Sequence, residues 1–85
     1  MRIVVTLHAA TKLRAHALPL ELVERGVNEP DWTEPDPLDP ALTRYYVMTP
    51  QRDYRIVGRF EDDDFVLVSV FPDRGARRRR ERLEA

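Results

Sequence analysis

Two histidines and a lysine recur every fourth residue near the start of the chain, at His8, Lys12 and His16. Residues four apart lie on one side of an α-helix, so a helix here would point all three side chains the same way. Imidazoles titrate near neutral pH, and a lysine ammonium adds a cation. Together they can move protons and stabilise a pentavalent phosphate, as RNA cleavage by its own 2'-hydroxyl requires. The alternative is an ordinary solvent-exposed helix face.

The same spacing argues against a metal. His8 and His16 would be two helical turns apart, about 12 Å along the axis, which is too far for both to ligate one ion. Neither a serine or cysteine nucleophile beside a base nor a glycine-rich phosphate loop is evident. We therefore predict His8, Lys12 and His16 as catalytic residues without a metal or cofactor.

Arginines provide candidate phosphate contacts. Over residues 54–60, strand alternation would put Arg55 and Arg59 on one face of a sheet. A guanidinium group binds phosphate through two parallel hydrogen bonds. We predict Arg55, Arg59 and Arg74, which follows the last strand, as residues that bind RNA or phosphate. For the two strand arginines, the alternative is an ordinary solvated sheet face.

The elements that would position these residues begin with a strand over residues 2–7. Its continuous apolar, β-branched run predicts a central or well-covered strand. Thr6 can cap a helix over about residues 7–17. Pro19 suits the start of a second short helix, and we expect Gly26 to be its left-handed C-terminal cap.

Residues 28–40 combine prolines with acidic residues and predict an extended loop. Trp32 in this loop would pin it to the domain, or would form an aromatic platform for a base or a partner chain. Residues 42–49, 54–60 and 65–71 predict a meander of three strands, the last of them interior. The fold class is α+β in the order β-α-α-β-β-β, with helices packed on one face of a small antiparallel sheet.

Length and composition are those of one small domain. The 85 residues are 42% hydrophobic and include no cysteine, so a disulfide framework is impossible. We expect a single domain over residues 1–74 and an arginine-rich tail or short helix over residues 75–85. The N-terminal apolar run is too short for a signal peptide or a membrane span, which predicts a soluble cytoplasmic protein without a membrane partner.

Charge is distributed unevenly along the chain. Residues 1–73 carry eight basic and thirteen acidic side chains, whereas residues 74–85 carry six arginines and two glutamates. A run of arginines can bind nucleic acid or an acidic partner. The alternative to a binding role is a disordered tail that keeps the protein soluble.

The first half of the chain resembles a known pattern. Residues 8–18 (HAATKLRAHAL), with Val23 and the NEPD of residues 28–31, resemble an uncharacterised bacterial family of small domains. The N-terminal pattern of that family is His-Ala-x-x-Arg-x-x-x-Arg-Gly-Ile, followed by a helix and a Pro-Asp.

The second half resembles the same family over residues 54–57 and over residues 69–74 (SVFPDR). Nearly the whole chain is therefore covered. This chain has Lys12 and His16 at the two arginine positions of the pattern, and Ala17 at its glycine. A lysine keeps the charge of arginine without its planar fork.

More loosely, residues 15–18 resemble the Lys-His-Gly-Val element of BrnT-type toxins, although Ala15 stands at their lysine, and residues 74–82 resemble their arginine-rich end. Both families are grouped with RelE/ParE-like small toxins. The resemblance implies helices against an antiparallel sheet, RNA or the ribosome as target, and an antitoxin-like protein as partner.

Two hypotheses from different classes follow. The first is a toxin-like RNA-binding or RNA-cleaving domain of the RelE/BrnT type, acting as a metal-independent endoribonuclease if it is an enzyme. The second is a non-catalytic protein-interaction module that docks through the acidic Pro/Trp loop or the arginine-rich tail.

Overall fold

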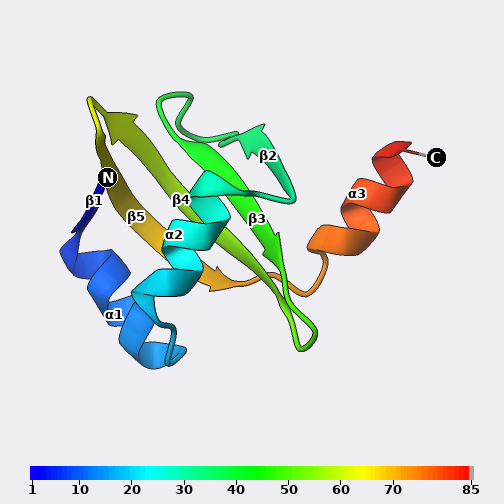
Figure 1. Cartoon of the computed structure of the whole chain (residues 1–85). Helices are drawn as coiled ribbons and strands as arrows, with labels where there is room; N and C mark the ends of the chain where they lie inside the picture. The colour runs from blue at the N-terminus through cyan, green and yellow to red at the C-terminus, as the bar shows by residue number, and fades with distance from the viewer. Residues whose placement is uncertain (85) are drawn as a thin grey trace.

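The computed structural model describes residues 1–84, which form one five-stranded sheet with the strand order β1-β5-β4-β3-β2 and three helices (Figure 1). The elements in chain order are β1 (Arg2–Val5), α1 (Leu7–Ala15), α2 (Leu20–Asn28), β2 (Trp32–Pro35), β3 (Thr43–Met48), β4 (Asp53–Glu61), β5 (Asp64–Pro72) and α3 (Ala76–Glu84). The predicted α+β class is confirmed. Among the described helices, none is long and apolar enough to cross a membrane.

The predicted meander is confirmed as β3, β4 and β5, which pair antiparallel in sequence order. β5 lies between β1 and β4, so the prediction that the most apolar strand is interior is also confirmed. A bulge interrupts its ladder, because Val57 pairs with Ser69 whereas Gly58 pairs with Leu67, which leaves Val68 without an opposite residue.

β1 is an edge strand, and the prediction of a central or well-covered strand is wrong. It pairs in parallel with β5 alone, and its side chains alternate between exposed and half-buried. Ile3 and Val5 pack against the core, whereas Val4 is 38% exposed. The apolar run was misleading because alternate residues of an edge strand can face water whatever their type.

The helix that carries the candidate residues, α1, begins where it was predicted and ends at Ala15, two residues before its predicted end. Thr6 caps α1 as predicted, since its Oγ1 accepts a hydrogen bond from the Ala9 backbone N–H at 3.2 Å. At the other end, the N–H of Leu18 donates to the carbonyl of Leu13, and the N–H of Ala17 donates to the carbonyl of Arg14. These two bonds form a Schellman motif with Ala17 in the left-handed region, at a φ of 52°.

Gly26 lies within α2, and its predicted role as a left-handed cap is wrong. A Cβ atom at this position would lie 2.3 Å from Cγ2 of Val47 and 2.4 Å from Cδ1 of Ile56. Glycine is present because the helix backbone lies directly on the sheet, and α2 continues to Asn28.

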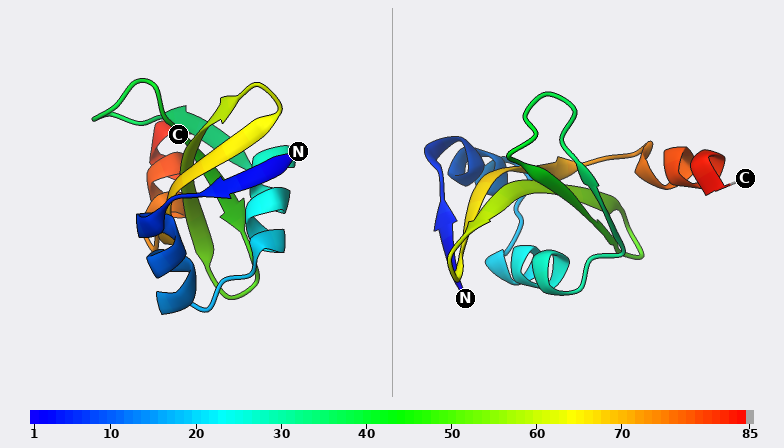
Figure 2. Two further views of the ribbon diagram at one scale, coloured as in Figure 1. Left: turned by 90° about the vertical axis from the view of Figure 1, so that its left-hand side faces the viewer. Right: turned by 90° about the horizontal axis from the view of Figure 1, so that it is seen from above.

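The core lies between the helices and the side of the sheet that carries Val47 and Ile56. In the right-hand view of Figure 2, α2 lies beneath the sheet and α1 lies beside β5. The buried cluster contains Ala9, Val23, Val27, Val47, Ile56, Phe65, Leu67 and Val70. Both helices therefore contribute residues to this one core.

The prediction that residues 28–40 form a loop throughout is wrong. Residues 32–35 form the second edge strand, β2, which pairs antiparallel with β3. Pro35 is accommodated because an edge strand leaves one row of backbone groups unpaired. Trp32 stacks on Tyr46 with ring centroids 4.6 Å apart, and this contact pins β2 to the sheet.

Candidate functional site

A surface groove of about 620 Å³ runs between α1 and the end of β5. We call it the α1 groove, and its lining residues are His8, Lys12, His16, Arg52, Ser69, Phe71, Pro72 and Arg74. Four of these lining residues belong to the predicted site and carry a basic or imidazole side chain. None of the lining residues that the structure describes is acidic. The structure thus brings together His8, Lys12, His16 and Arg74.

α1 aims its three candidate residues into the groove because its opposite side is anchored. Ala9 is fully buried, and Leu13 packs against the same core cluster. With the core on that side, the residues at positions 8, 12 and 16 are directed towards the end of β5. His8 and His16 are exposed, so both imidazoles are accessible to a ligand.

Ser69 holds His8 from the floor of the groove. Its Oγ lies 3.3 Å from Nε2 of His8, a hydrogen bond between residues 61 positions apart in the chain. Because Nε2 is engaged, Nδ1 is the ring nitrogen that remains for a proton exchange with a ligand. Sequence reasoning missed this contact because only the pairing of β1 with β5 brings α1 beside Ser69.

Arg52 is the second residue of the groove that sequence reasoning missed. It ends the β3–β4 turn, where Thr49 accepts a hydrogen bond from the Arg52 N–H through Oγ1 at 3.0 Å and donates its own N–H to the Arg52 carbonyl at 2.9 Å. The turn joins two of the predicted strands, but its direction depends on how those strands twist. Arg52 and Arg74 are both exposed, and neither makes an ion pair with the side chains described for residues 1–83.

The two strand arginines lie outside the groove lining. Arg55 has its Nε 3.7 Å from the Asp73 carboxylate, and its guanidinium stacks over the Phe71 ring at 4.3 Å. It is therefore next to the groove floor but already neutralised. Arg59 pairs with Glu61 at 2.9 Å near the β4–β5 hairpin. Arg55 and Arg59, which were predicted to bind phosphate, therefore do not line the groove with His8.

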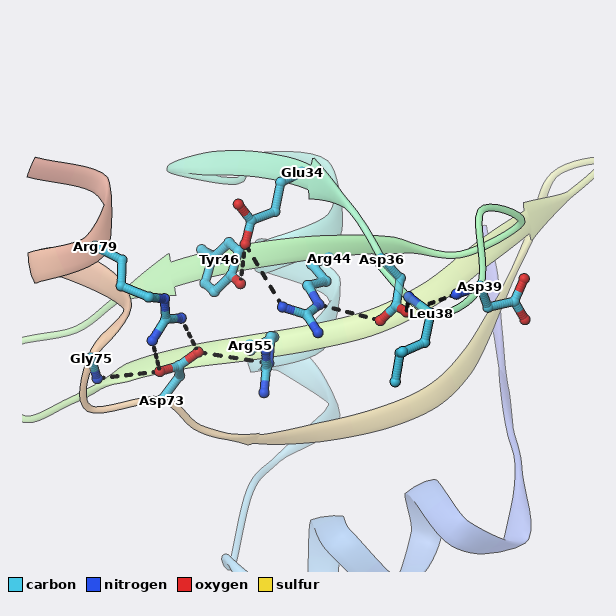
Figure 3. Close-up of polar contacts among 10 residues, drawn as sticks. All are labelled: Glu34, Asp36, Leu38, Asp39, Arg44, Tyr46, Arg55, Asp73, Gly75 and Arg79. Carbon is cyan, nitrogen blue, oxygen red and sulfur yellow. Dashed lines mark hydrogen bonds and ion pairs between the residues drawn. The ribbon is translucent and has the colours of Figure 1, made fainter. Parts of the chain in front are cut away.

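Asp73 is the centre of an ionic cluster on the sheet face opposite α2 (Figure 3). Its carboxylate accepts hydrogen bonds from Arg79 at 2.6 Å and from the Gly75 N–H at 3.2 Å, and it also faces Arg55. We call Asp73, Arg55 and Arg79 the Asp73 cluster. Burial alone would raise the pKa of Asp73, but the hydrogen bond and charge of Arg79, with the charge of Arg55, hold that pKa below its ordinary value.

A second set of polar contacts continues along β2 and β3 (Figure 3). Nε of Arg44 donates to Asp36 at 3.2 Å, and the hydroxyl of Tyr46 donates to Glu34. Backbone N–H groups of Leu38 and Asp39, with Arg44, lower the pKa of Asp36. Several acidic residues of the proline-rich segment are thus occupied by contacts within the domain.

The chemistry that the α1 groove can support follows from this composition. It offers imidazoles for proton exchange, cations for phosphate oxygens and the Phe71 ring for an apolar group. In the described part of the chain, no group of three or more His, Cys, Asp or Glu residues could hold a metal ion.

Comparisons with known proteins add no assignment. No family model matches the chain, and neither the curated proteins nor the solved structures yield a significant match.

Proposed function

We propose that the protein is a toxin-like RNA-binding and RNA-cleaving domain of the RelE/BrnT type, with the α1 groove as its active site. The observation that carries this proposal is the convergence of His8, Lys12, His16 and Arg74 in a groove whose described lining contains no carboxylate. Cations without acidic neighbours attract phosphate, because no local partner competes for them.

The geometry supports different roles for the two histidines. His8 is held by Ser69 and lies one turn from Lys12, whereas His16 is two turns away, about 12 Å along the helix. We assign proton transfer to His8 and charge stabilisation to Lys12. His16 and Arg74 would then bind phosphates on either side of the reacting one.

In the proposed reaction, unprotonated His8 takes the proton of a 2'-hydroxyl, whose oxygen attacks the adjacent phosphorus. The bond from phosphorus to the 5'-oxygen breaks, and that oxygen takes a proton from water; the resulting hydroxide takes the proton that His8 had gained, which restores the unprotonated imidazole. The products are a 2',3'-cyclic phosphate and a 5'-hydroxyl. Lys12 stabilises the additional negative charge in the transition state, where such a cation is most effective.

One backbone feature supports the resemblance on which the toxin assignment rests. The pattern of the uncharacterised bacterial family has glycine where this chain has Ala17. Ala17 has a φ of 52° in the Schellman motif of α1, a conformation that glycine adopts most readily. The pattern therefore agrees with the backbone requirement at the end of this helix.

The interaction-module hypothesis receives less support at its loop. The Trp32 ring is stacked between Tyr46 and the guanidinium of Arg80, which lies 4.7 Å from the ring centroid. Glu34 and Asp36 already have partners on β3. A docking role through the arginine-rich end remains an alternative prediction, which a pull-down with and without residues 75–85 would test.

The test of the enzymatic proposal is cleavage of end-labelled RNA in the presence of a metal chelator. We expect His8→Ala to lower the cleavage rate about 100-fold, the lower end of the contribution of a general base. Lys12→Gln should lower it as well, and mass spectrometry should find cyclic phosphate ends. Arg14→Gln is the matched control, because Arg14 lies on the same helix but outside the groove lining.

Two results would overturn the proposal. One is intact RNA and intact ribosome-bound message after incubation with the wild-type protein. The other is cell growth on expression that is the same for the wild type and for the double variant His8→Ala with His16→Ala.

A further inference from the structure

A second groove adjoins the α1 groove on the α3 side. We call it the α3 groove; it has a volume of about 560 Å³ and lies between the β3–β4 turn and α3. Arg52, Pro72 and Arg74 line both grooves, so the two are continuous around the end of β5. Arg77, Arg78 and Glu81 of α3 line only the second.

The arginines of α3 differ in their contacts with the rest of the domain. Arg77 pairs with Asp53 at 2.7 Å, Arg79 pairs with Asp73, and Arg80 stacks on Trp32. These three contacts fix α3 against the sheet. Arg78 is exposed and makes no ion pair with the side chains of residues 1–83, and it faces the α3 groove.

We infer that the two grooves together bind one single strand of RNA, and that the α3 groove holds the phosphates that flank the cleavage site. The inference rests on the proposed function in placing the reacting phosphate beside His8. The strand would contact Lys12 in the α1 groove, Arg52 and Arg74 at the boundary that the two grooves share, and Arg78 in the α3 groove.

A single strand fits this surface better than a duplex does. The cations line hollows on either side of a shared boundary, and Phe71 places an aromatic ring in the floor of the first hollow. Unpaired bases can turn towards an aromatic side chain while their phosphates follow a basic groove. The bases of a duplex are stacked on each other and cannot reach such a floor.

The experiment measures binding of labelled, 2'-O-methylated RNA of about 12 nucleotides, which cannot be cleaved and which is long enough for both grooves. Arg78→Gln should weaken binding about fivefold and lower the dependence of log Kd on log salt by about 0.7, as expected for one lost phosphate contact on a single strand. Arg52→Gln should do the same, which guards against a local folding defect at Arg78. A labelled dinucleotide, which fills only the α1 groove, should bind equally to the wild type and to Arg78→Gln.

The matched control is Arg82→Gln, which removes the same charge one turn farther along α3, outside the lining of the groove. Equal weakening by Arg78→Gln and Arg82→Gln would overturn the inference, because it would show general attraction to a basic helix. Tighter binding of a duplex of the same sequence, or a similar sensitivity to Arg78→Gln in the binding of a poly-glutamate peptide, would also overturn it.

The two proposals fail separately. If RNA is not cleaved but Arg78→Gln weakens binding selectively, the continuous binding surface stands without the enzyme. If cleavage depends on His8 but Arg78→Gln and Arg82→Gln are indistinguishable, the enzyme stands and the α3 groove has no role in binding.

Discussion

At the junction of β5 and α3, two neighbouring sets of arginines have opposite surroundings. Arg55 and Arg79 share the buried carboxylate of Asp73, whereas Arg52 and Arg74 are exposed and have no acidic partner among residues 1–83. The side-chain chemistry is the same in both sets. The difference lies in the acidic residues that the fold supplies, and it separates arginines that hold the structure from arginines that are available to a ligand.

The two sets of arginines should contribute differently to the stability of the fold. Removing either partner of a buried ion pair lowers the stability of the fold, because the partner that stays behind is a charge without a counter-charge. This applies to the Asp73 carboxylate and to the two guanidinium groups that face it. An exposed, unpaired arginine contributes little to folding, and its removal should change stability by less than about 0.5 kcal/mol. Stability measurements can therefore assign each arginine to one set.

The largest expected effect on stability is that of Asp73→Asn. This variant leaves Arg55 and Arg79 near a neutral amide, and we expect the free energy of unfolding to fall by about 2–3 kcal/mol, less than for a fully buried pair because Arg79 is half-exposed. For a domain of this size the melting temperature should fall by about 10 °C or more. Urea denaturation and calorimetry would measure both quantities.

Asp63→Asn serves as the control for this prediction, because Asp63 is an exposed residue of the β4–β5 turn and the charge change is identical. If the two variants unfold at the same urea concentration, the Asp73 cluster does not stabilise the fold, and the distinction between the two arginine sets is lost.

Acid should remove part of the same stabilisation in the wild type. The pKa of Asp73 lies below its ordinary value of 3.8 in the folded protein, so the folded state binds fewer protons than the unfolded state does. The contribution of Asp73 is thus fully present above that ordinary value and is lost as the pH falls through the lower, folded pKa. The difference in unfolding free energy between the wild type and Asp73→Asn should narrow as the pH is lowered below about 4. A constant difference across this range would contradict the assignment.

Sequence reasoning predicted the elements whose signals are local. The strands 42–49, 54–60 and 65–71 agree with β3, β4 and β5 to within a few residues, and Thr6 caps α1 as expected. The failures concern tertiary context. Gly26 is small because α2 lies against Val47 and Ile56, which no turn signal could reveal, and the short β2 exists because β3 offers a partner edge.

In the candidate site, too, the residues placed by local signals were predicted and those placed by tertiary context were not. Helical spacing was enough to place His8, Lys12 and His16 on one wall, because a helix fixes the direction of residues four apart. The opposite wall depends on pairing between distant strands, so Ser69 and Arg52 were missed. Strand alternation could not show that Arg55 is paired and Arg74 is not, since the acidic partner of Arg55 is Asp73, which follows the end of β5.

The smallest predicted effect concerns the end of the helix that carries the groove. Ala17 occupies the left-handed position of a Schellman motif, which costs an L-residue with a Cβ atom about 1 kcal/mol. Ala17→Gly should therefore raise the free energy of unfolding by about 0.5–1 kcal/mol, after the greater entropy of glycine in the unfolded chain is deducted. Ala15→Gly, two residues earlier and inside α1, should have the opposite sign because glycine weakens a helix. Urea denaturation of the two variants beside the wild type would detect both changes, and a loss of stability in Ala17→Gly would mean that the groove wall does not end in this motif in solution. RNA binding should be unchanged by Ala17→Gly, since neither the cations of the α1 groove nor the Asp73 cluster is altered.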